Sequence, residues 1–204
     1  DVYKRQYRGY AAQDLCAKCK FEEVAYLILN GELPSKKQLK KFEKEERKER
    51  KLSKTLLDDI IKFPKKAHPM DVARTAVSIM GLEDKETKDN SPKANMRKVM
   101  RIFAKMPVAL AAFYRARKGK RIIPPKSKLS FSENFFYMCF GKVPNKDIVK
   151  AFDVSLILYA EHSFNVSTFT ARTITSSLSD IHGAITGAIA SLKGPLHGGA
   201  NAVS

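Results

Sequence analysis

The sequence predicts an all-α protein with many helices and short breaks. Apolar residues recur at helical spacing over long stretches, as in residues 148–159. No alternating pattern of polar and apolar residues is long enough for a useful strand, and no internal repeat is evident. Proline and glycine interrupt the periodic stretches at intervals, which sets the expected ends of the helices: Asn30-Gly31, Pro34, Pro64, Ile122-Ile-Pro-Pro125, Gly141 and Pro144.

Two helices are expected first, at residues 13–19 and 21–29. Ser35 is then a plausible N-cap for a highly charged helix that reaches about residue 50. In that helix lysines and arginines alternate with glutamates at spacings of three and four, which favours a solvated helix face. A helix that binds nucleic acid would carry fewer acids and some stacking aromatics, so we prefer the solvated face.

The middle of the chain predicts further helices. Proline suits a first helical turn, and an acid there suits the helix dipole, so His68-Pro69 with Asp71 indicates a helix start. We expect His68 to act as a local cap. The predicted elements are a short helix at 52–63, the helix from His68, a polar loop at 83–92, and a long helix at 96–117 kinked at Pro107.

Three more helices complete the prediction. Residues 129–140 carry five aromatics at helical spacing, which we interpret as core. Asn145 can cap the helix that leads to His162. Residues 183–192 are small and weakly polar, and this composition is typical of a helix packed closely against another.

Composition limits the possible function classes. The chain has 204 residues, 44% of them hydrophobic, which allows one or two globular domains. A net charge of +17 attracts polyanions, although a lysine-rich soluble surface explains it more simply. No apolar run approaches ~18 residues and no signal peptide is visible, so we expect no membrane span.

Cysteine usage points away from disulfides and metals. The cysteines are Cys16, Cys19 and Cys139, which are too few for a disulfide scaffold and indicate a reducing compartment. Cys16-Ala-Lys-Cys19 has the C-x-x-C spacing but lacks a second ligand pair near by. We therefore predict no metal site.

Two histidines near the end of the chain have unlike settings. His162 ends an apolar helical stretch and is followed by hydrogen-bonding residues, which suggests the wall of a pocket. Gly194 and Pro195 stop a helix before His197, and Gly198-Gly199 after it let the backbone approach a ligand. If a helix begins near Ala200, its dipole keeps the His197 imidazole neutral. A neutral imidazole can donate a hydrogen bond to a developing enolate oxygen.

The same residues carry a family resemblance. The stretches Glu161-His-Ser-Phe-Asn-Val-Ser-Thr-Phe-Thr-Ala-Arg172 and Gly194-Pro-Leu-His-Gly-Gly-Ala-Asn201 resemble the citrate synthase family, including 2-methylcitrate synthases. Three further pieces match in order: Tyr7-Arg-Gly-Tyr10, the stretch from Phe21-Glu-Glu-Val-Ala25 to Asn30-Gly-Glu-Leu-Pro34, and His68-Pro-Met-Asp-Val-Ala-Arg-Thr75. Ordered matches from residue 7 to residue 203 are far more specific than a lone His-Gly-Gly.

The resemblance implies a function and assigns residues to it. It implies condensation of acetyl-CoA or propionyl-CoA with oxaloacetate, with the acyl-CoA as a substrate and no separate cofactor. It also implies a homodimer, and a cytoplasmic location in bacteria or the mitochondrial matrix in eukaryotes. By resemblance, His197 is the catalytic, enolate-stabilising residue, His162 and Asn165 bind the substrate oxaloacetate, and Gly198, Gly199 and Asn201 shape the turn.

The resemblance also sets the expected domains. Residues 1–6 join poorly to the motif that begins at Tyr7 and resemble an extraneous tail, whereas 7–204 match part of a helical large domain of the citrate synthase type. That domain is truncated near the start of a small domain, which is largely missing. The family's second catalytic histidine and its aspartate base are absent, so we expect no turnover from this chain alone. A non-catalytic homologue and a basic nucleic-acid-binding module remain as alternatives.

Overall fold

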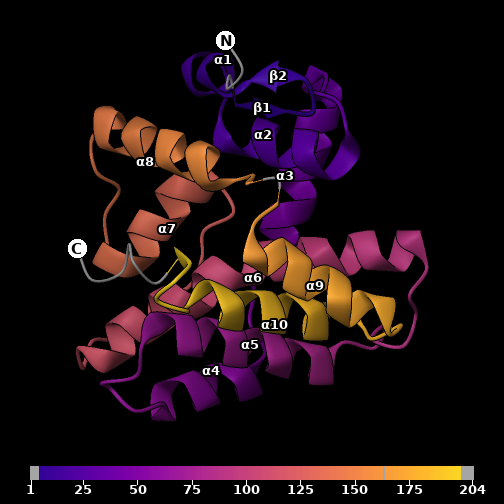
Figure 1. The fold of residues 1–204 in the computed structure, drawn as a ribbon. Coiled ribbons are helices and arrows are strands. Elements are labelled where there is room, and N and C mark those ends of the chain that lie inside the picture. The colour runs from indigo at the N-terminus through magenta and orange to yellow at the C-terminus, as the bar shows by residue number, and fades with distance from the viewer. Residues whose placement is uncertain (1–4, 163, 199–204) are drawn as a thin grey trace. The chain divides into compact units, whose positions relative to one another are not determined.

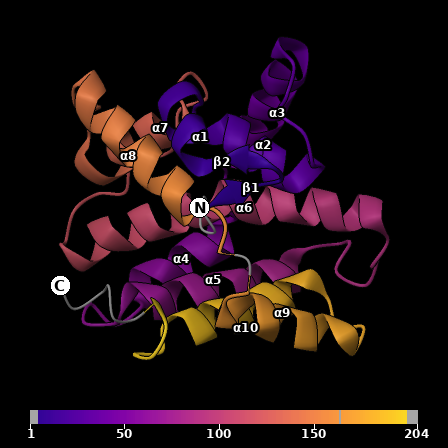
Figure 2. The ribbon, with the colours of Figure 1, turned by 45° about the horizontal axis from the view of Figure 1, so that its top comes forward.

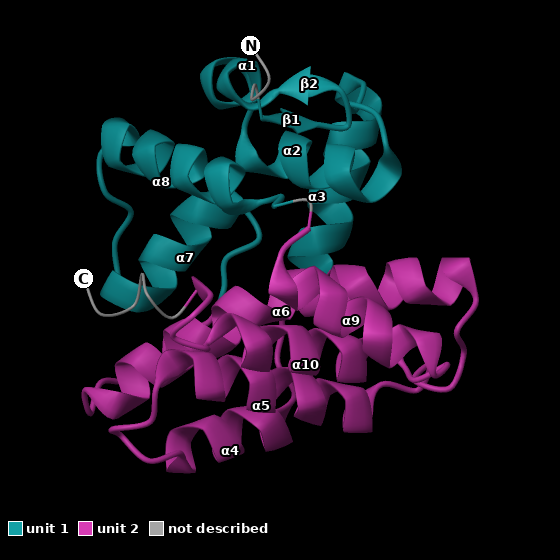
Figure 3. Ribbon diagram, in the orientation of Figure 1, with its two compact units in different colours: residues 1–48, 125–162 teal, residues 49–124, 163–204 magenta. Residues whose placement is uncertain are grey.

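The computed structural model describes residues 5–162 and 164–198, and within these ranges it contains ten helices and two very short strands (Figure 1). The prediction of an all-α protein is confirmed. The chain forms two compact units. Unit 1 combines residues 1–48 with 125–162, and unit 2 combines residues 49–124 with 163–204 (Figure 3).

Unit 1 opens with a hairpin that the sequence pattern did not predict as strands. Strand β1 (Gln6–Tyr7) pairs antiparallel with β2 (Tyr10–Ala11). Arg8 and Gly9, with φ of 52° and 89°, form the two-residue turn, and positive φ at both positions suits the twist of a tight hairpin. Two-residue strands are too short to show an alternating pattern. The Tyr7 side chain is fully buried and donates its hydroxyl hydrogen to the carbonyl oxygen of Ile157, at 2.8 Å.

The helices of unit 1 follow local capping signals. Ser35 and Gln38 exchange hydrogen bonds at the start of the charged helix, with the Ser35 amide donating to Gln38 Oε1 at 2.8 Å. Asn145 Oδ1 accepts the amide hydrogen of Ile148 at 3.0 Å, as the cap prediction required. The helices are α1 (Ala12–Lys18), α2 (Phe21–Asn30), α3 (Lys36–Glu49), α7 (Phe131–Phe140) and α8 (Lys146–Tyr159).

Helix α3 has the solvated character that its alternating charges predicted. Lys41 pairs with Glu45 and Glu43 with Arg47, both at i,i+4 spacing. Only Phe42 and Glu46 of this helix are buried. The Phe42 ring packs edge-on against Tyr26 of α2, with 5.6 Å between centroids.

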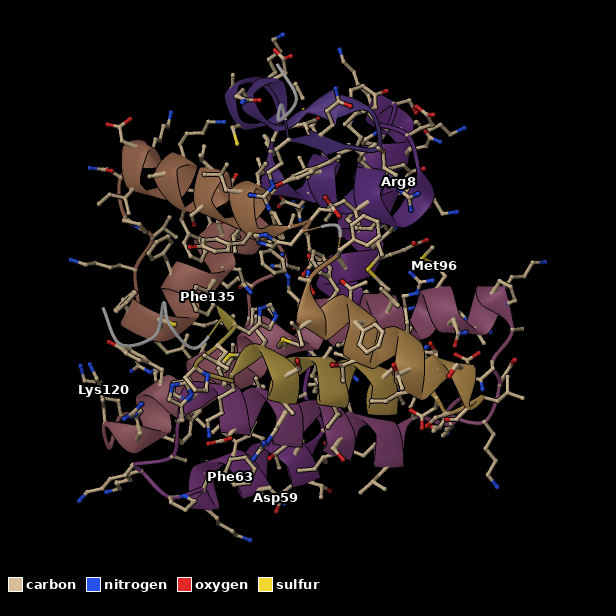
Figure 4. All side chains as sticks on the ribbon, viewed as in Figure 1. Arg8, Asp59, Phe63, Met96, Lys120 and Phe135 are labelled. Atoms are coloured by element: carbon tan, nitrogen blue, oxygen red, sulfur yellow. The ribbon has the colours of Figure 1, made fainter. Side chains whose placement is uncertain are left out.

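We predicted that the aromatic residues of α7 lie in the core, but none of them is fully buried. Phe140 is 53% exposed and the other four aromatics are half-buried. A ten-residue helix with aromatics on neighbouring positions cannot turn all of them to one side. Phe135, labelled in Figure 4, and Phe136 both pack on Phe152 of α8, at 5.6 and 5.0 Å between centroids. The fully buried positions of α7 belong instead to Ser132, Asn134, Met138 and Cys139.

Unit 2 is a group of packed helices. Its apolar core includes Ala73, Val77, Ile102 and Ile189, which come from three different helices. The long helix begins at Pro92 rather than at residue 96, because Ser91 caps it and Pro92 fits the first turn. Pro107 lies inside it. The helices are α4 (Lys54–Lys62), α5 (Pro69–Glu83), α6 (Pro92–Arg117), α9 (Val166–Ser176) and α10 (Ile181–Leu192).

Helix α10 packs closely against its neighbours, as its small residues predicted. It contacts α5 and α9, and α9 and α10 run side by side in both views (Figures 1 and 2). A Cβ atom added at Gly187 would lie 2.3 Å from Ile174 Cδ1 of α9, a distance that real Cβ atoms do not show. Gly187 therefore lies at the contact between α9 and α10, where a larger residue would force Ile174 to shift.

Candidate active site

The segment around His197 folds back against the end of α10. Lys193 is the C-cap of this helix, and the amide of Gly194 donates to the carbonyl oxygen of Ser191 at 3.0 Å. The His197 amide then donates to the carbonyl oxygen of Gly194 at 2.9 Å, which closes a tight turn. The helix thus ends at the Gly194-Pro195 break, as the sequence predicted.

Gly198 lies where no side chain fits. A Cβ atom at this position would lie 2.4 Å from Leu192 Cδ1 and 2.8 Å from the Leu192 carbonyl oxygen. The backbone can therefore return onto the last turn of α10 only because residue 198 is a glycine. The other residues predicted to shape the turn, Gly199 and Asn201, lie outside the described residues, as does Ala200, where we expected a helix to begin.

The His197 ring has a hydrogen-bond partner that the sequence pattern did not single out. Ser167 Oγ lies 2.8 Å from His197 Nε2, and both groups are partly buried. Among the described residues no hydrogen bond reaches Nδ1 of His197. If the Ser167 hydroxyl donates to Nε2, the proton of a neutral imidazole lies on Nδ1, which is then the free donor. A free N–H donor of this kind can donate a hydrogen bond to an enolate oxygen.

Helix α9 holds Ser167 in its first turn. Asn165 is the N-cap, and its Oδ1 accepts the amide hydrogen of Thr168 at 2.7 Å. The Oδ1 atom of Asn165 is therefore engaged locally, while its NH₂ group remains the part that could contact a substrate. Asn165, Ser167 and His197 thus come together in unit 2.

His162 belongs to unit 1 and is exposed, three residues after the end of α8. Its ring lies 6.0 Å from the ring of Tyr159. Arg5 Nη2 lies 2.9 Å from His162 Nδ1, and the same guanidinium donates to the carbonyl oxygen of Glu161. Because a guanidinium can only donate, Nδ1 must accept, and the proton of a neutral His162 lies on Nε2.

The contacts of Arg5 involve a segment that we predicted to be extraneous. Gln6 pairs with Ala11 in the hairpin, and the carbonyl oxygen of Arg5 accepts the amide hydrogen of Ala12 at 2.8 Å. Residues 5 and 6 therefore have defined positions next to the family-like motif. Their origin as a tail stays a prediction.

The remaining histidines have structural surroundings. His68 Nδ1 accepts the amide hydrogen of Met70 at 3.2 Å, so the predicted cap is confirmed. His182, to which we assigned no role, is 2% exposed, and burial lowers its pKa. It lines a hollow of about 390 Å³ in unit 2, beside Asp84 and Arg101. The Asp84 carboxylate in this hollow is paired with Arg101 at 2.8 Å.

No metal-binding cluster occurs in the described part of the chain, where groups of three or more histidine, cysteine or acidic side chains do not come together. All three cysteines are free thiols, and Cys19 and Cys139 are buried. None of the described helices combines the length and the apolar character needed to span a membrane.

Comparison with known proteins supports the same family as the motifs. The family model described as "Citrate synthase, C-terminal domain" matches residues 3–203. The chain is 51% identical over 195 residues to citrate synthase of Mycolicibacterium smegmatis, covering 96% of this chain and 52% of that protein. It is 53% identical over 203 residues to 2-methylcitrate synthase 2 of Corynebacterium glutamicum, again covering 96% and 52%. The chain therefore spans about half the length of these relatives.

Solved structures agree with the sequence matches. Citrate synthase from Pyrobaculum aerophilum matches with a TM-score of 0.90 at 36% identity, covering 97% of this chain and 51% of that one. Citrate synthase from Thermoplasma acidophilum, solved as a ternary complex with carboxymethyl coenzyme A and oxaloacetate, matches with a TM-score of 0.89 at 29% identity, covering 98% and 56%. The order of the motifs, the helical fold and these matches lead to one conclusion: the chain belongs to the citrate synthase family.

Proposed function

We propose that the protein containing this chain condenses an acyl-CoA with oxaloacetate. Acetyl-CoA would give citrate, and propionyl-CoA would give 2-methylcitrate. Family membership supports this reaction, because the named relatives include both kinds of synthase. Both substrates are polyanions, and the net charge of +17 favours their approach. The CoA thioester is a substrate, and the reaction as proposed uses no separate cofactor.

The observation that carries the proposal is the hydrogen bond between Ser167 and His197 Nε2. Condensation begins when a base removes a proton from the carbon next to the thioester carbonyl. The carbonyl oxygen then gains negative charge, and a hydrogen bond from His197 Nδ1 stabilises the enolate. Ser167 favours this role because it can hold the ring in the tautomer whose Nδ1 carries the proton.

In the same proposal His162 and Asn165 bind oxaloacetate. On the family resemblance we assign His162 to the bound oxo acid, and its Nδ1 contacts the Arg5 guanidinium at 2.9 Å. On the same resemblance we assign Asn165, in unit 2, to oxaloacetate as well. Gly198, together with Gly199 and Asn201, shapes the backbone near the reacting carbon.

A homodimer is part of the proposal, because apolar side chains lie exposed on unit 2. Val166 and Phe169 of α9 are 53% and 72% exposed, and Leu178 just beyond the helix is 82% exposed. Apolar surface of this kind is typical of a protein interface. Since the named relatives are bacterial, we place the complete protein in the cytoplasm.

The test requires the part of the enzyme that this chain does not span. We would join the 204-residue chain to the remaining half of the Mycolicibacterium smegmatis citrate synthase and measure thiol release from acetyl-CoA and propionyl-CoA with oxaloacetate. We expect turnover from this chimera, and none from the 204-residue chain alone. The His197→Ala chimera is the matched control.

Two results would count against the proposal. A folded chimera that binds oxaloacetate without turnover would favour a non-catalytic homologue. Turnover that is unchanged by His197→Ala would remove His197 from the mechanism.

A further inference from the structure

An ion pair joins the segment before His197 to another helix. Lys193 Nζ lies 2.6 Å from Asp71 Oδ2, although the two residues are 122 positions apart in the sequence. Asp71 occupies the first turn of α5, and Lys193 is the C-cap of α10. Both side chains are partly shielded, with 28% and 37% exposure. Partial shielding reduces the screening of the two charges by solvent, so this pair can contribute more than a fully exposed ion pair.

The turn that bears His197 starts directly after this pair. Lys193 ends α10 through its backbone, whose amide donates to the carbonyl oxygen of Ile189 at 3.2 Å, while its side chain reaches α5. The neighbouring Leu192 contacts Gly198 closely, at the far end of the turn. Two adjacent residues therefore hold the turn, since Lys193 fixes its start to α5 and Leu192 fixes its end to α10.

A third contact acts on the His197 ring itself. Ser167 holds Nε2 from α9, so the ring direction depends on the position of the turn relative to α9. Helix α10 is packed between these restraints, with Ile189 in the apolar core beside Ala73 and Val77 of α5. This core fixes the middle of α10, whereas the ion pair acts at its last residue, next to the turn.

We infer that Asp71 and Lys193 are positioning residues, and that their ion pair fixes the turn of residues 194–198 so that Ser167 and His197 keep their hydrogen bond. Asp71 accepts the ammonium group on Oδ2 and lies 3.0 Å from Arg74 on Oδ1, so its carboxylate stays ionised and directed at Lys193. Among the described residues neither side chain hydrogen-bonds to the His197 ring. They act through His197, and only the kinetic consequence rests on the proposed function.

The first test uses the 204-residue chain and does not depend on activity. The chain has four histidines, so the imidazole signals of a histidine-labelled sample can be assigned by NMR, replacing one histidine at a time. We expect Asp71→Asn and Lys193→Met each to move the His197 ring signals in the direction that Ser167→Ala moves them. His162, which lies in unit 1, should keep its signals. Asp71→Asn is isosteric, so it tests the pair even if Lys193→Met fails to fold.

Two further variants separate positioning from loss of charge. Arg74→Met removes the second cation of Asp71 but leaves the bond to Lys193, and should leave the His197 signals in place. The reversed pair, Asp71→Lys with Lys193→Asp, should restore signals that either change alone disturbs. Unchanged His197 signals in folded Asp71→Asn would overturn the inference.

The second test uses the chimera with the Mycolicibacterium smegmatis half. Lys193→Met should lower kcat roughly tenfold, because a small misplacement of a reacting group is costly. The affinity for oxaloacetate should change less than about twofold, since the pair does not touch that substrate. A rise in the oxaloacetate KM at unchanged kcat would contradict the inference. If the NMR signals move but no form of the chimera turns over, the proposed function fails and the positioning role stands.

Discussion

Ser167 and His197 are joined by a hydrogen bond of 2.8 Å between Oγ and Nε2, across 30 residues of sequence. The bond connects the first turn of α9 with the turn after α10. It leaves Nδ1 of His197 as the ring nitrogen that can act on a reactant. The position of Ser167 therefore sets the direction of the His197 ring, and if its hydroxyl donates to Nε2, the neutral ring carries its proton on Nδ1.

Replacing Ser167 tests this relationship. In the chimera Ser167→Ala should lower kcat about tenfold, because losing one hydrogen bond costs roughly 1–1.5 kcal/mol. Steady-state kinetics with saturating oxaloacetate measures the change. Thr170→Ala is the matched control, since Thr170 lies one turn later and bonds only to the Val166 carbonyl oxygen among the described residues. Equal losses in both variants would mean that α9 is disturbed in general.

The helices could be predicted because their signals are local. Asn145 and His68 cap the helices that begin just after them through atoms two or three residues away, and these contacts depend on sequence alone. The small residues of 183–192 were informative for the same reason, because small residues within a helix indicate close packing wherever the neighbour comes from. The family motifs added the candidate site, and the structure supplies contacts for His162, Asn165 and His197 without testing their roles.

The features that the sequence did not predict depend on contacts between distant segments. The partners of His197 and His162 are Ser167 and Arg5, and no spacing rule connects residues so far apart. Phe140 was expected in the core, but its exposure depends on where α8 packs. The hairpin of residues 6–11 was missed because strands of two residues show no periodicity.

Glu22 predicts a pH dependence of stability in unit 1. Its side chain is 2% exposed, and burial raises its pKa, although the amide of Phe131 donates to Oε1 at 2.8 Å. A carboxyl group whose folded pKa is raised stabilises the fold at low pH, and this contribution is lost as the pH rises through the folded pKa. Stability should therefore decline from about pH 4.5, the ordinary pKa of a glutamate, towards neutral pH.

The variant Glu22→Gln tests the direction of this pH dependence. Glutamine keeps the acceptor for Phe131 and has no charge, so the variant should be more stable at pH 7.5 by roughly 1 kcal/mol, with little gain at about pH 4. Urea unfolding followed by circular dichroism at both pH values measures it. The control variant Glu45→Gln, at an exposed position of α3, should leave the free energy of unfolding unchanged at both pH values. A larger gain at the acidic pH than at the neutral one would refute the assignment.

His182 predicts the opposite pH dependence of stability in unit 2. Burial lowers its pKa, although the carboxylates of Asp84 and Asp180, each 3.5 Å from the ring, act in the other direction. The neutral ring is therefore favoured in the folded state. The contribution of the neutral ring to folding stability is complete above the ordinary histidine pKa of 6.5. This contribution is lost as the pH falls below that value.

His182→Phe should flatten this acid decline. The expected result is a smaller drop in Tm between about pH 7 and pH 5.5 than in the unchanged chain, because the aromatic ring cannot gain a proton. Differential scanning calorimetry at a series of pH values is the measurement. A steeper acid decline in His182→Phe would show that the charged form stabilises the fold.

The two candidate site histidines should fail in different ways in the chimera. We assign His197 to the enolate, which exists only along the reaction path. His197→Ala should therefore lower kcat by about 10²–10³ and leave oxaloacetate affinity nearly intact. We assign His162 to the bound oxo acid, so His162→Ala should weaken oxaloacetate binding as well as slow the reaction.

Isothermal titration with oxaloacetate, beside steady-state kinetics, separates these outcomes. His68→Ala provides a control, because that side chain caps α5 and has no assigned contact with substrate. It should lower Tm while binding and kcat stay close to those of the unchanged chimera. If His197→Ala abolished oxaloacetate binding and His162→Ala did not, the assignments would be reversed. In that case the Ser167 hydroxyl would orient a substrate-binding ring, and the enolate would need another donor.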